Sequence, residues 1–450
     1  MNQLQAEPGF RWTPWVVLAF VALWPTVGPA EAVLSLGAVT SLGLLAWRRF
    51  RGGTRVLSRE AWALITALFF CYWLPELLSA IDAVDRARAW REVLLDLRYL
   101  PFLWLTAMAV APKRGRRIVF TGLGVIALAW ALDAIIQALT GWSLGGANSS
   151  DRLSGIFGAG NLKLGLVLAA LSPFALDAAA ERFHTAGWIV AAGVVGVVIL
   201  LAGSRGSWVM YALVLLLSGW RRIGRKRLAL LMIAGAVLAG GLALAVSPQF
   251  QSRIERSLAA FNGDRAGLDQ ALSGRLSLWH AALGMIDAHP VNGVGIRGFR
   301  DAYAQYAAKD DFWLAHGQNG ALHAHQIVLE ILSETGLLGL LLWLMGLALA
   351  IRAWRWSLPA ARRRARVPAL ALVVTAFPLN TSLAFYSTFW GSVFLLLLAL
   401  FAGALFALED DDAPARPRAP ALLESELLEQ ELREPEPREP ELREAQPPAG

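Results

Sequence analysis

Long apolar runs recur along almost all of this 450-residue chain, and they constrain its fold more than any other feature. A helix needs roughly 20 apolar residues to cross a hydrocarbon core of about 30 Å. We therefore predict an all-α, polytopic membrane protein, a bundle of about 12 transmembrane helices with one large helical loop outside the membrane. The runs begin near Trp12, Ala30, Ala61, Val93, Ile118, Leu162, Thr185, Ser207, Leu228, Gln326, Val367 and Thr388.

The composition supports this class and excludes others. Charged residues make up 17% of the chain and hydrophobic residues 56%, whereas a soluble domain carries about 25% charge. An ordinary soluble enzyme and a disordered chain are therefore excluded. The single cysteine, Cys71, lies in an apolar run, so the chain forms no intramolecular disulfide and no cysteine zinc cluster. The 19 tryptophans suit the two interfaces of a membrane.

The distribution of lysine and arginine predicts the orientation. Basic clusters lie within residues 48–59, 113–117, 221–227 and 352–366, and each follows an even-numbered predicted span. Because cytoplasmic loops retain positive charge, this pattern places both termini in the cytoplasm and the loops after odd-numbered spans outside.

The spans divide the chain into four parts. Residues 1–246 hold the first nine spans, 247–325 form the outside loop, and 326–408 hold the last three spans. Residues 409–450 carry 13 acidic and 5 basic residues and many prolines. Such a segment cannot bury enough apolar surface to fold, so we expect a disordered, acidic cytoplasmic tail.

The outside loop is unusually long for a connection, and loops of this length are usually functional. Its segment SGRLSLWHAALGMIDAHP has apolar residues at three- and four-residue spacing, which predicts a helix that ends before Pro290. RGFRDAYAQYAA predicts a second, shorter helix. The outside segment TGWSLGGANSSDRLSGIFGAGN is expected to pack beside this loop.

Arg205 lies in the short turn LLAGSRGSW between two apolar spans. An arginine at that depth is unfavourable unless it meets an anion or a partner. It could instead extend its guanidinium to the interface, although the positive-inside trend argues against an idle arginine on the outer side.

Arg275 begins the predicted helix GRLSLWHAAL. A guanidinium at a helix N-terminus is repelled by the helix dipole unless an anion shares the site. The alternative is a surface arginine that pairs with an acid such as Asp269.

His325 lies where the long loop re-enters the membrane, two residues after His323. A histidine near water can transfer a proton or activate a hydroxyl. A capping or core role is the simpler interpretation, and a metal-binding His-x-His pair is disfavoured because no carboxylate lies at ligand spacing. Two arginines and a histidine on one membrane face predict a site for a pyrophosphate lipid, because arginine binds phosphate oxygens bidentately.

These segments resemble the O-antigen ligase/polymerase family of bacterial inner membranes. The resemblance is carried by GSRGSW around Arg205, by SGRLSLWHAALGMIDAHPVNGVGIRGF from Ser273 to Phe299, and by HAHQIVLEILSETGLLGLLLWL from His323 to Leu344. They lie within roughly residues 150–345. Within the family, the pattern is most similar to that of the lipopolysaccharide O-antigen ligases.

The resemblance implies a metal-independent, inverting glycosyl transfer on the periplasmic side of the inner membrane. O-antigen on undecaprenyl pyrophosphate, the donor, would move to a sugar hydroxyl of lipid A–core, the acceptor. It implies that Arg205 and Arg275 bind the donor pyrophosphate and that His325 activates the acceptor hydroxyl. We expect no cofactor, no metal and no nucleic-acid partner, so the partners are donor, acceptor and membrane lipids.

Further residues have secondary or structural roles in this interpretation. Arg297, Arg300 and His323 are possible secondary site residues that add positive potential. Glu334 and Gly336 match the family pattern, and we expect Glu334 to satisfy a nearby partner and Gly336 to permit close helix packing. The family often has asparagine after the histidine, where this chain has Gln326, which can still form hydrogen bonds.

Three other functions stay open at this point. An O-antigen polymerase would use the same donor with a second lipid-linked glycan as acceptor. A protein O-oligosaccharyltransferase would transfer to a protein and commonly has a larger C-terminal region. A transporter would show charges within several central spans, and the sequence offers only Asp133, Lys163 and Asp177.

Overall fold

The computed structural model describes residues 11–51, 57–147, 152–246, 272, 274–309, 311–315, 321–377 and 383–407. The chain divides into two units, Met1–Leu408 and Glu409–Gly450, and the second unit lies entirely outside the described residues. The predicted acidic tail and much of the predicted outside loop therefore lie outside them as well.

The described residues are almost entirely helical. Their strands are the antiparallel pair β1 (Trp142–Ser143) and β2 (Gly146–Ala147). The helices are α1 (Thr13–Ala22), α2 (Val27–Arg51), α3 (Arg59–Ser79), α4 (Arg86–Asp96), α5 (Tyr99–Val110), α6 (Lys113–Thr140), the 3-10 helix η2 (Gly155–Phe157), α7 (Lys163–Leu201), α8 (Arg205–Ile223), α9 (Arg225–Val246), α12 (Arg275–Ala288), α13 (Phe299–Tyr306), α14 (Phe312–Ala315), α15 (Ile327–Trp356), α16 (Pro359–Arg364), α17 (Arg366–Thr375) and α18 (Thr388–Leu405).

The apolar runs found in the sequence coincide with helices, and the run that begins near Val93 is divided between the end of α4 and α5. Helix α7 contains two of these runs, and non-helical dihedral angles at Phe183 and His184 bend the helix between them. Among the described residues, seven helical stretches are long and apolar enough to cross a membrane. A multi-pass helical membrane protein is thus confirmed, whereas the count of about 12 spans stays a prediction. The seven stretches are Gly28–Phe50, Arg59–Ser79, Arg86–Val110, Lys113–Thr140, Lys163–Leu201, Ile327–Trp356 and Thr388–Leu405.

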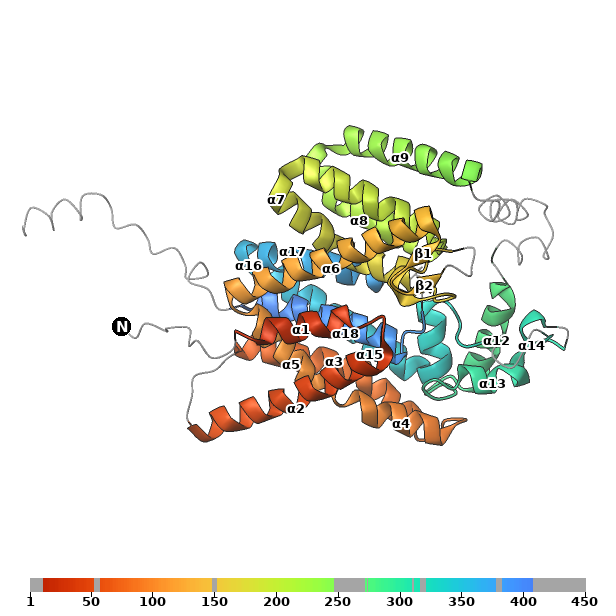
Figure 1. Cartoon of the computed structure of the whole chain (residues 1–450). Coiled ribbons are helices and arrows are strands. Elements are labelled where there is room, and N and C mark those ends of the chain that lie inside the picture. The colour runs from red at the N-terminus through yellow and green to blue at the C-terminus, as the bar shows by residue number, and fades with distance from the viewer. Residues whose placement is uncertain are drawn as a thin grey trace, which may run out of the picture. The chain divides into compact units, whose positions relative to one another are not determined.

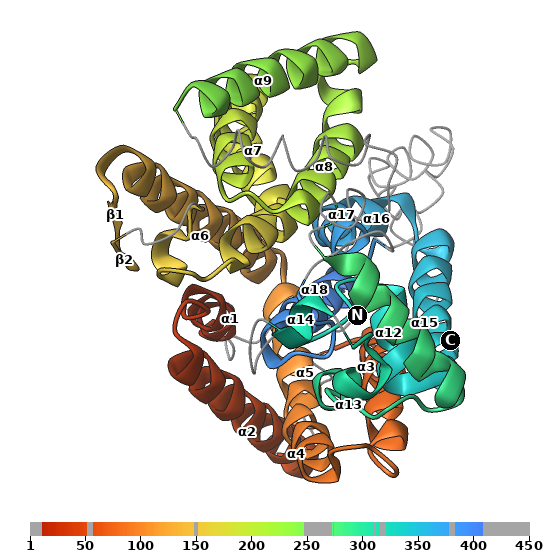
Figure 2. The ribbon, with the colours of Figure 1, turned by 90° about the vertical axis from the view of Figure 1, so that its right-hand side faces the viewer.

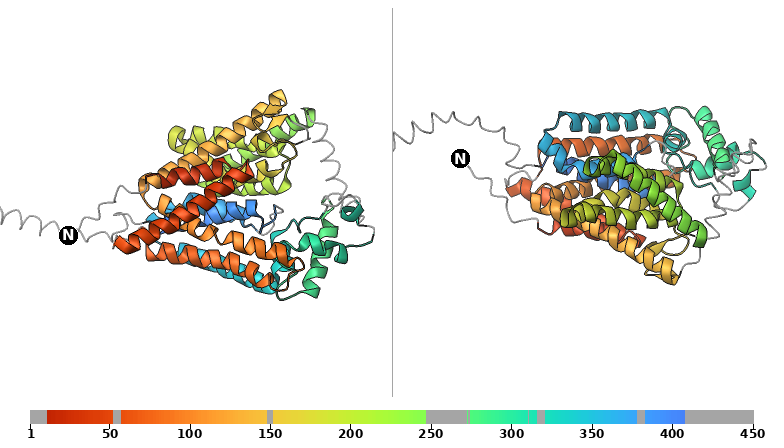
Figure 3. Two further views of the ribbon diagram at one scale, coloured as in Figure 1. Left: turned by 60° about the horizontal axis from the view of Figure 1, so that its bottom comes forward. Right: turned by 90° about the horizontal axis from the view of Figure 1, so that it is seen from above.

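The long helices run back and forth between two ends of a bundle (Figure 1). Helices α12, α13 and α14 lie with β1 and β2 at one end, which faces the viewer in Figure 2 and which we call the loop end. The described residues of the four basic clusters gather at the opposite end, toward the left of Figure 1, and both panels of Figure 3 show the helices that run between the two ends. This separation agrees with the predicted alternation of the loops. Which end faces the cytoplasm stays a prediction.

Helix α18 forms the centre of the bundle. Its residues from Trp390 to Leu405 are all buried, as expected for a helix that is apolar on every side. Small residues allow close approach, since a Cβ at Gly403 would lie 2.8 Å from the Cα of Ala107 in α5. At the loop end, the Tyr99 hydroxyl donates a hydrogen bond of 2.9 Å to the carbonyl of Thr388. This hydrogen bond fixes the first residues of α18 to α5 at the loop end.

Candidate active site at the loop end

A break in α15 holds the loop segment 290–295 against the membrane-spanning helix. Gly336 has φ +65°, ψ −164°, so the helix loses its regular hydrogen bonds there. The loop replaces them: its N–H groups donate to carbonyls of the helix, and N–H groups of the helix donate to its carbonyls. Backbone groups that would otherwise be buried without partners are thereby satisfied. Four hydrogen bonds do this: Val294 N to Ser333 O (2.9 Å), Gly295 N to Glu334 O (3.0 Å), Leu337 N to Pro290 O (2.9 Å) and Leu338 N to Val291 O (3.1 Å).

Glycine is required on both sides of this junction. A Cβ on Gly336 would overlap the carbonyl oxygen of Val291, and one on Gly293 (φ +69°) would overlap the backbone of Glu334. We expected Gly336 to serve helix packing, but the structure shows that it admits the loop into a broken helix. The Glu334 carboxylate accepts a hydrogen bond of 3.0 Å from the backbone N–H of Arg297, which is the kind of partner that we expected for it.

Arg205 is the first residue of α8 and follows the turn that ends α7. The segment 152–158 lies against this turn, because the N–H of Leu153 donates to the carbonyl of Leu201 at 3.4 Å. This contact carries Arg152 to the same end of the bundle as Arg205.

Two polar residues of α6 hold the segment that carries Arg152. The Gln137 Oε1 accepts hydrogen bonds from the N–H groups of Ser154 (3.0 Å) and Gly155 (2.8 Å). Asp133 accepts one of 2.8 Å from the N–H of Leu144. Asp133, a candidate transport charge in the sequence, thus fixes the loop between α6 and α7.

Arg275 is partly buried at the start of α12, and it lies within electrostatic reach of the other two arginines. Burial lowers the pKa of its guanidinium, and the positive charges of Arg205 and Arg152 lower it further. Arg275 is thus electrostatically coupled to Arg205, the other arginine that the sequence predicted, and also to Arg152. Such a group of guanidinium ions is well suited to a polyanion.

His323 and His325 lie against each other, with ring centroids 3.8 Å apart. His325 has φ +52°, and α15 begins two residues later. The Gln326 side chain caps that helix, since its Oε1 accepts a hydrogen bond of 2.6 Å from the N–H of Leu329. Within the described residues, no third ligand joins the two histidines in a group that could hold a metal ion.

Trp279 connects the helix of Arg275 to the histidine pair. It lies four residues after Arg275, on the same face of α12. Its indole Nε1 donates a hydrogen bond of 3.1 Å to the carbonyl of Ala324, the residue between the two histidines. Arg275 and His325 thus belong to one packed unit rather than to separate loops.

Arg297 and Arg300 line a cavity whose lining does not include Arg152, Arg205 or Arg275. The positive charges that lower the pKa of Arg300, after burial, belong to Arg297 and Arg88, whereas Asp301 and Glu334 oppose that shift. Arg297, Arg300 and His323 line a common cavity. The two secondary arginines therefore form a second cationic region, which shares the histidine pair with the first.

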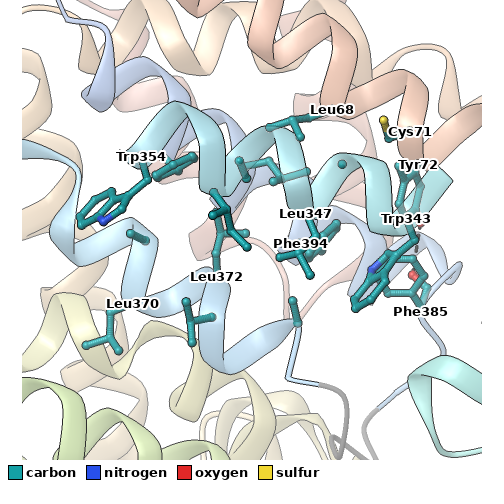
Figure 4. A pocket seen from close by; sticks show the side chains of 18 of the residues that line it. Leu68, Cys71, Tyr72, Trp343, Leu347, Trp354, Leu370, Leu372, Phe385 and Phe394 are labelled. Atoms are coloured by element: carbon teal, nitrogen blue, oxygen red, sulfur yellow. Dashed lines mark hydrogen bonds between the residues drawn. The ribbon is translucent and has the colours of Figure 1, made fainter. Parts of the chain in front are cut away.

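A large apolar cavity of about 410 Å³ lies between α3, α15, α17 and α18 (Figure 4). Trp343 and Phe385 lie at one end and Trp354 toward the other. The N–H of Phe385 donates a hydrogen bond of 2.6 Å to Glu330, which lies five residues after His325. The cavity therefore begins within about two helical turns of the histidine pair and continues into the membrane-spanning part.

Arg152 and Gln137 are the site residues that sequence reasoning missed. The signal for Arg152 was present, because its Gly-, Ser- and Asn-rich segment was expected to pack beside the outside loop. Gln137 had no comparable signal, since a single glutamine near the end of an apolar run is uninformative without its contacts.

The geometry defines a helical membrane protein with an arginine–histidine site at one end of its bundle. Residues 189–344 match the family model described as O-Antigen ligase, so this segment of the chain is similar to that family. That segment runs from the second half of α7 to the middle of α15, and it includes Arg205, Arg275 and His325.

One similar protein is the exopolysaccharide production protein ExoQ of Rhizobium meliloti (strain 1021). It is 33% identical over 176 residues, which cover 36% of this chain and 38% of that protein. The chain thus spans well under half the length of this curated relative. The description of the family model and the name of the relative both refer to bacterial polysaccharides, in line with the resemblance that the sequence motifs indicated.

Proposed function

We propose that this protein is a lipopolysaccharide O-antigen ligase, a membrane glycosyltransferase that uses a glycan on undecaprenyl pyrophosphate as donor. The glycan would move to a sugar hydroxyl of lipid A–core on the periplasmic side of the inner membrane. The observation that carries this proposal is the grouping of Arg152, Arg205 and Arg275 beside a helix that is tied to the His323–His325 pair.

The arginine group is suited to the donor and to the leaving group. A diphosphate leaves with increased negative charge on its bridging oxygen, and fixed guanidinium groups stabilise that charge without reorganisation. Because Arg275 is partly buried among like charges, an anion at this point relieves an unfavourable arrangement. The same groups hold the anomeric carbon of the donor in place.

The His325 imidazole would receive the proton of the attacking hydroxyl. The new bond joins the acceptor oxygen to the anomeric carbon, and the bond from that carbon to the diphosphate oxygen breaks, with its electron pair leaving on the diphosphate. Attack from the face opposite the leaving group inverts the anomeric carbon. The 3.8 Å ring contact with His323 restricts the orientation of the His325 ring.

The apolar cavity of Figure 4 suits the polyprenyl tail of the donor. Its lining is dominated by leucine and aromatic side chains of α15, α17 and α18. Because the cavity begins near Glu330, a lipid whose diphosphate lies at the loop end could extend its tail into it.

An O-antigen polymerase is the second candidate, because the similar Rhizobium protein is named for exopolysaccharide production. A polymerase differs only in its acceptor, a second lipid-linked glycan. A protein O-oligosaccharyltransferase shares the donor chemistry, but no feature of the described residues favours it. Transport is disfavoured because Asp133 is used to hold a loop.

Transfer by the purified, reconstituted protein tests the proposal. Donor is supplied as undecaprenyl-pyrophosphate glycan, and rough lipopolysaccharide is compared with a second portion of lipid-linked glycan as acceptor. Ligation to lipopolysaccharide supports the ligase, and elongation of the lipid-linked glycan alone assigns the polymerase. The assay is repeated with a chelator, where complete loss of transfer would overturn the arginine-based mechanism.

A further inference from the structure

A second cavity, of about 370 Å³, lies at the loop end and is lined by cationic side chains. It lies between the turn that joins α1 to α2, the start of α7, the segment 297–300 and the start of α18. Lys163, Arg297, Arg300 and His323 line it, whereas Arg152, Arg205 and Arg275 do not. It is therefore a separate cationic site that meets the proposed catalytic histidine pair.

The charge of this cavity is not balanced by its own acidic residue. Glu31 is the acidic residue in its lining, and Glu31 forms an ion pair with Arg98, which lies outside the lining. Lys163 is held over the ring of Phe389, with its Nζ 4.2 Å from the centroid. Lys163, Arg297 and Arg300 thus line a cavity whose carboxylate is already paired with an arginine outside it.

The charge of Arg300 likewise has no acidic residue to itself. Its Nε is buried and has no hydrogen-bond partner among the described residues. Asp301, which could offset its charge, is ion-paired with Arg88, and Glu334 is shared with Arg297. A buried guanidinium N–H without a partner is unfavourable, and an anion that enters the cavity would satisfy it.

We propose that this cavity binds a phosphate group on the acceptor, a second lipid-anchored glycan, while the arginine group around Arg275 binds the donor diphosphate. The inference rests on the proposed function, because it assumes that donor and acceptor meet at the histidine pair. It concerns the acceptor of the proposed ligase, lipid A–core, which carries phosphate close to its lipid anchor.

The position of His323 favours this assignment. Its ring lines the cavity and contacts the ring of His325. An acceptor anchored by its phosphate in the cavity would therefore lie beside the histidine pair. Two separate anion sites also prevent donor and acceptor phosphates from competing for the same arginines.

A binding measurement tests the proposal independently of turnover. Native mass spectrometry compares the affinity of the detergent-solubilised protein for rough lipopolysaccharide with its affinity for the same lipid after phosphatase treatment. We expect Arg300→Gln and Lys163→Gln each to weaken binding of the phosphorylated lipid by about tenfold or more. Arg86→Gln, an exposed arginine of α4, serves as the matched control and should bind as the wild type does.

The dephosphorylated lipid distinguishes phosphate recognition from a general loss of structure. It should bind the wild type and both variants equally, and undecaprenyl pyrophosphate should keep its wild-type affinity. Equal weakening on both forms of the acceptor, or weakened binding of undecaprenyl pyrophosphate instead, would overturn the inference. A wild type that binds as expected but transfers no glycan would count against the proposed function alone.

Discussion

Trp279 and Ala324 are joined by a hydrogen bond of 3.1 Å from the indole nitrogen to the backbone carbonyl. The bond links two segments 45 positions apart in the chain. One carries Arg275 at the start of α12, and the other carries His323 and His325 just before α15. The spacing between the proposed donor site and the proposed base is therefore set by a single tertiary contact and the packing around it.

Removal of this bond should impair transfer more than it impairs stability. Trp279→Phe keeps an aromatic ring but leaves the Ala324 carbonyl without its donor, and we expect about a tenfold lower rate because a small misplacement weakens alignment. Initial rates of glycan transfer measure the effect. Trp73→Phe is the matched control, because the indole of Trp73 donates a similar bond of 2.9 Å to Val93 away from the site. Equal rate losses in the two variants would contradict the prediction.

Arg275 should require a guanidinium and not merely a positive charge. We expect Arg275→Ala to reduce transfer by about a hundredfold or more, and Arg275→Lys to restore little of it, because an ammonium ion does not reproduce the bidentate fork. Initial rates at varied donor concentration measure the effect, and Arg86→Lys is the control. Arg205→Ala and Arg205→Lys should behave in the same way. Near-wild-type rates in the lysine variants would contradict the prediction, because they would show that a positive charge is sufficient at positions 205 and 275.

His325 should affect the chemical step rather than donor binding. We expect His325→Gln and His325→Ala to lower kcat by about a hundredfold to ten-thousandfold while donor KM changes little. The pH–rate profile should also lose the limb that reports deprotonation of the base. Unimpaired transfer by His325→Ala would remove the proposed activation of the acceptor hydroxyl.

The broken helix at Gly336 should not tolerate a side chain. Gly336→Ala places a Cβ against the Val291 carbonyl at φ +65°, so we expect a loss of about 1–3 kcal/mol in stability and a corresponding fall in active protein. Thermal unfolding in detergent, with transfer activity measured alongside, checks this. Gly43→Ala is the control, since a Cβ there meets nothing within 4 Å in helix α2. A Gly336→Ala protein as stable as Gly43→Ala would show that the junction can shift without cost.

Part of this architecture follows directly from the residues. Apolar runs coincide with the seven stretches of the described residues that are long and apolar enough to span a membrane, because a chain in lipid must satisfy its backbone hydrogen bonds within the helix itself. The sequence separates two runs near Leu162 and Thr185, and the structure has one helix there that is bent at Phe183–His184. Arg205, Arg275 and His325 could be named because charged groups beside apolar runs are unfavourable without a role.

Other features were settled only by contacts between distant segments. Gly336 and the segment 290–295 are about 40 positions apart, and neither shows alone that a loop replaces the broken hydrogen bonds of α15. Arg152 joins Arg275 because Gln137 and the turn before α8 hold its loop. The cavity with Lys163, Arg297 and Arg300 is likewise assembled from four separate elements.

The sequence by itself therefore determined the class of the protein and its helices, and it predicted three candidate site residues. These features depend on the hydrophobicity of each segment and on the unfavourable free energy of a charge near lipid, and both are properties of a single segment. The tertiary structure alone decided how the arginines group, which loop closes α15 and where a second anion could bind. Those properties depend on distances between segments remote in the chain, and a linear pattern does not encode them.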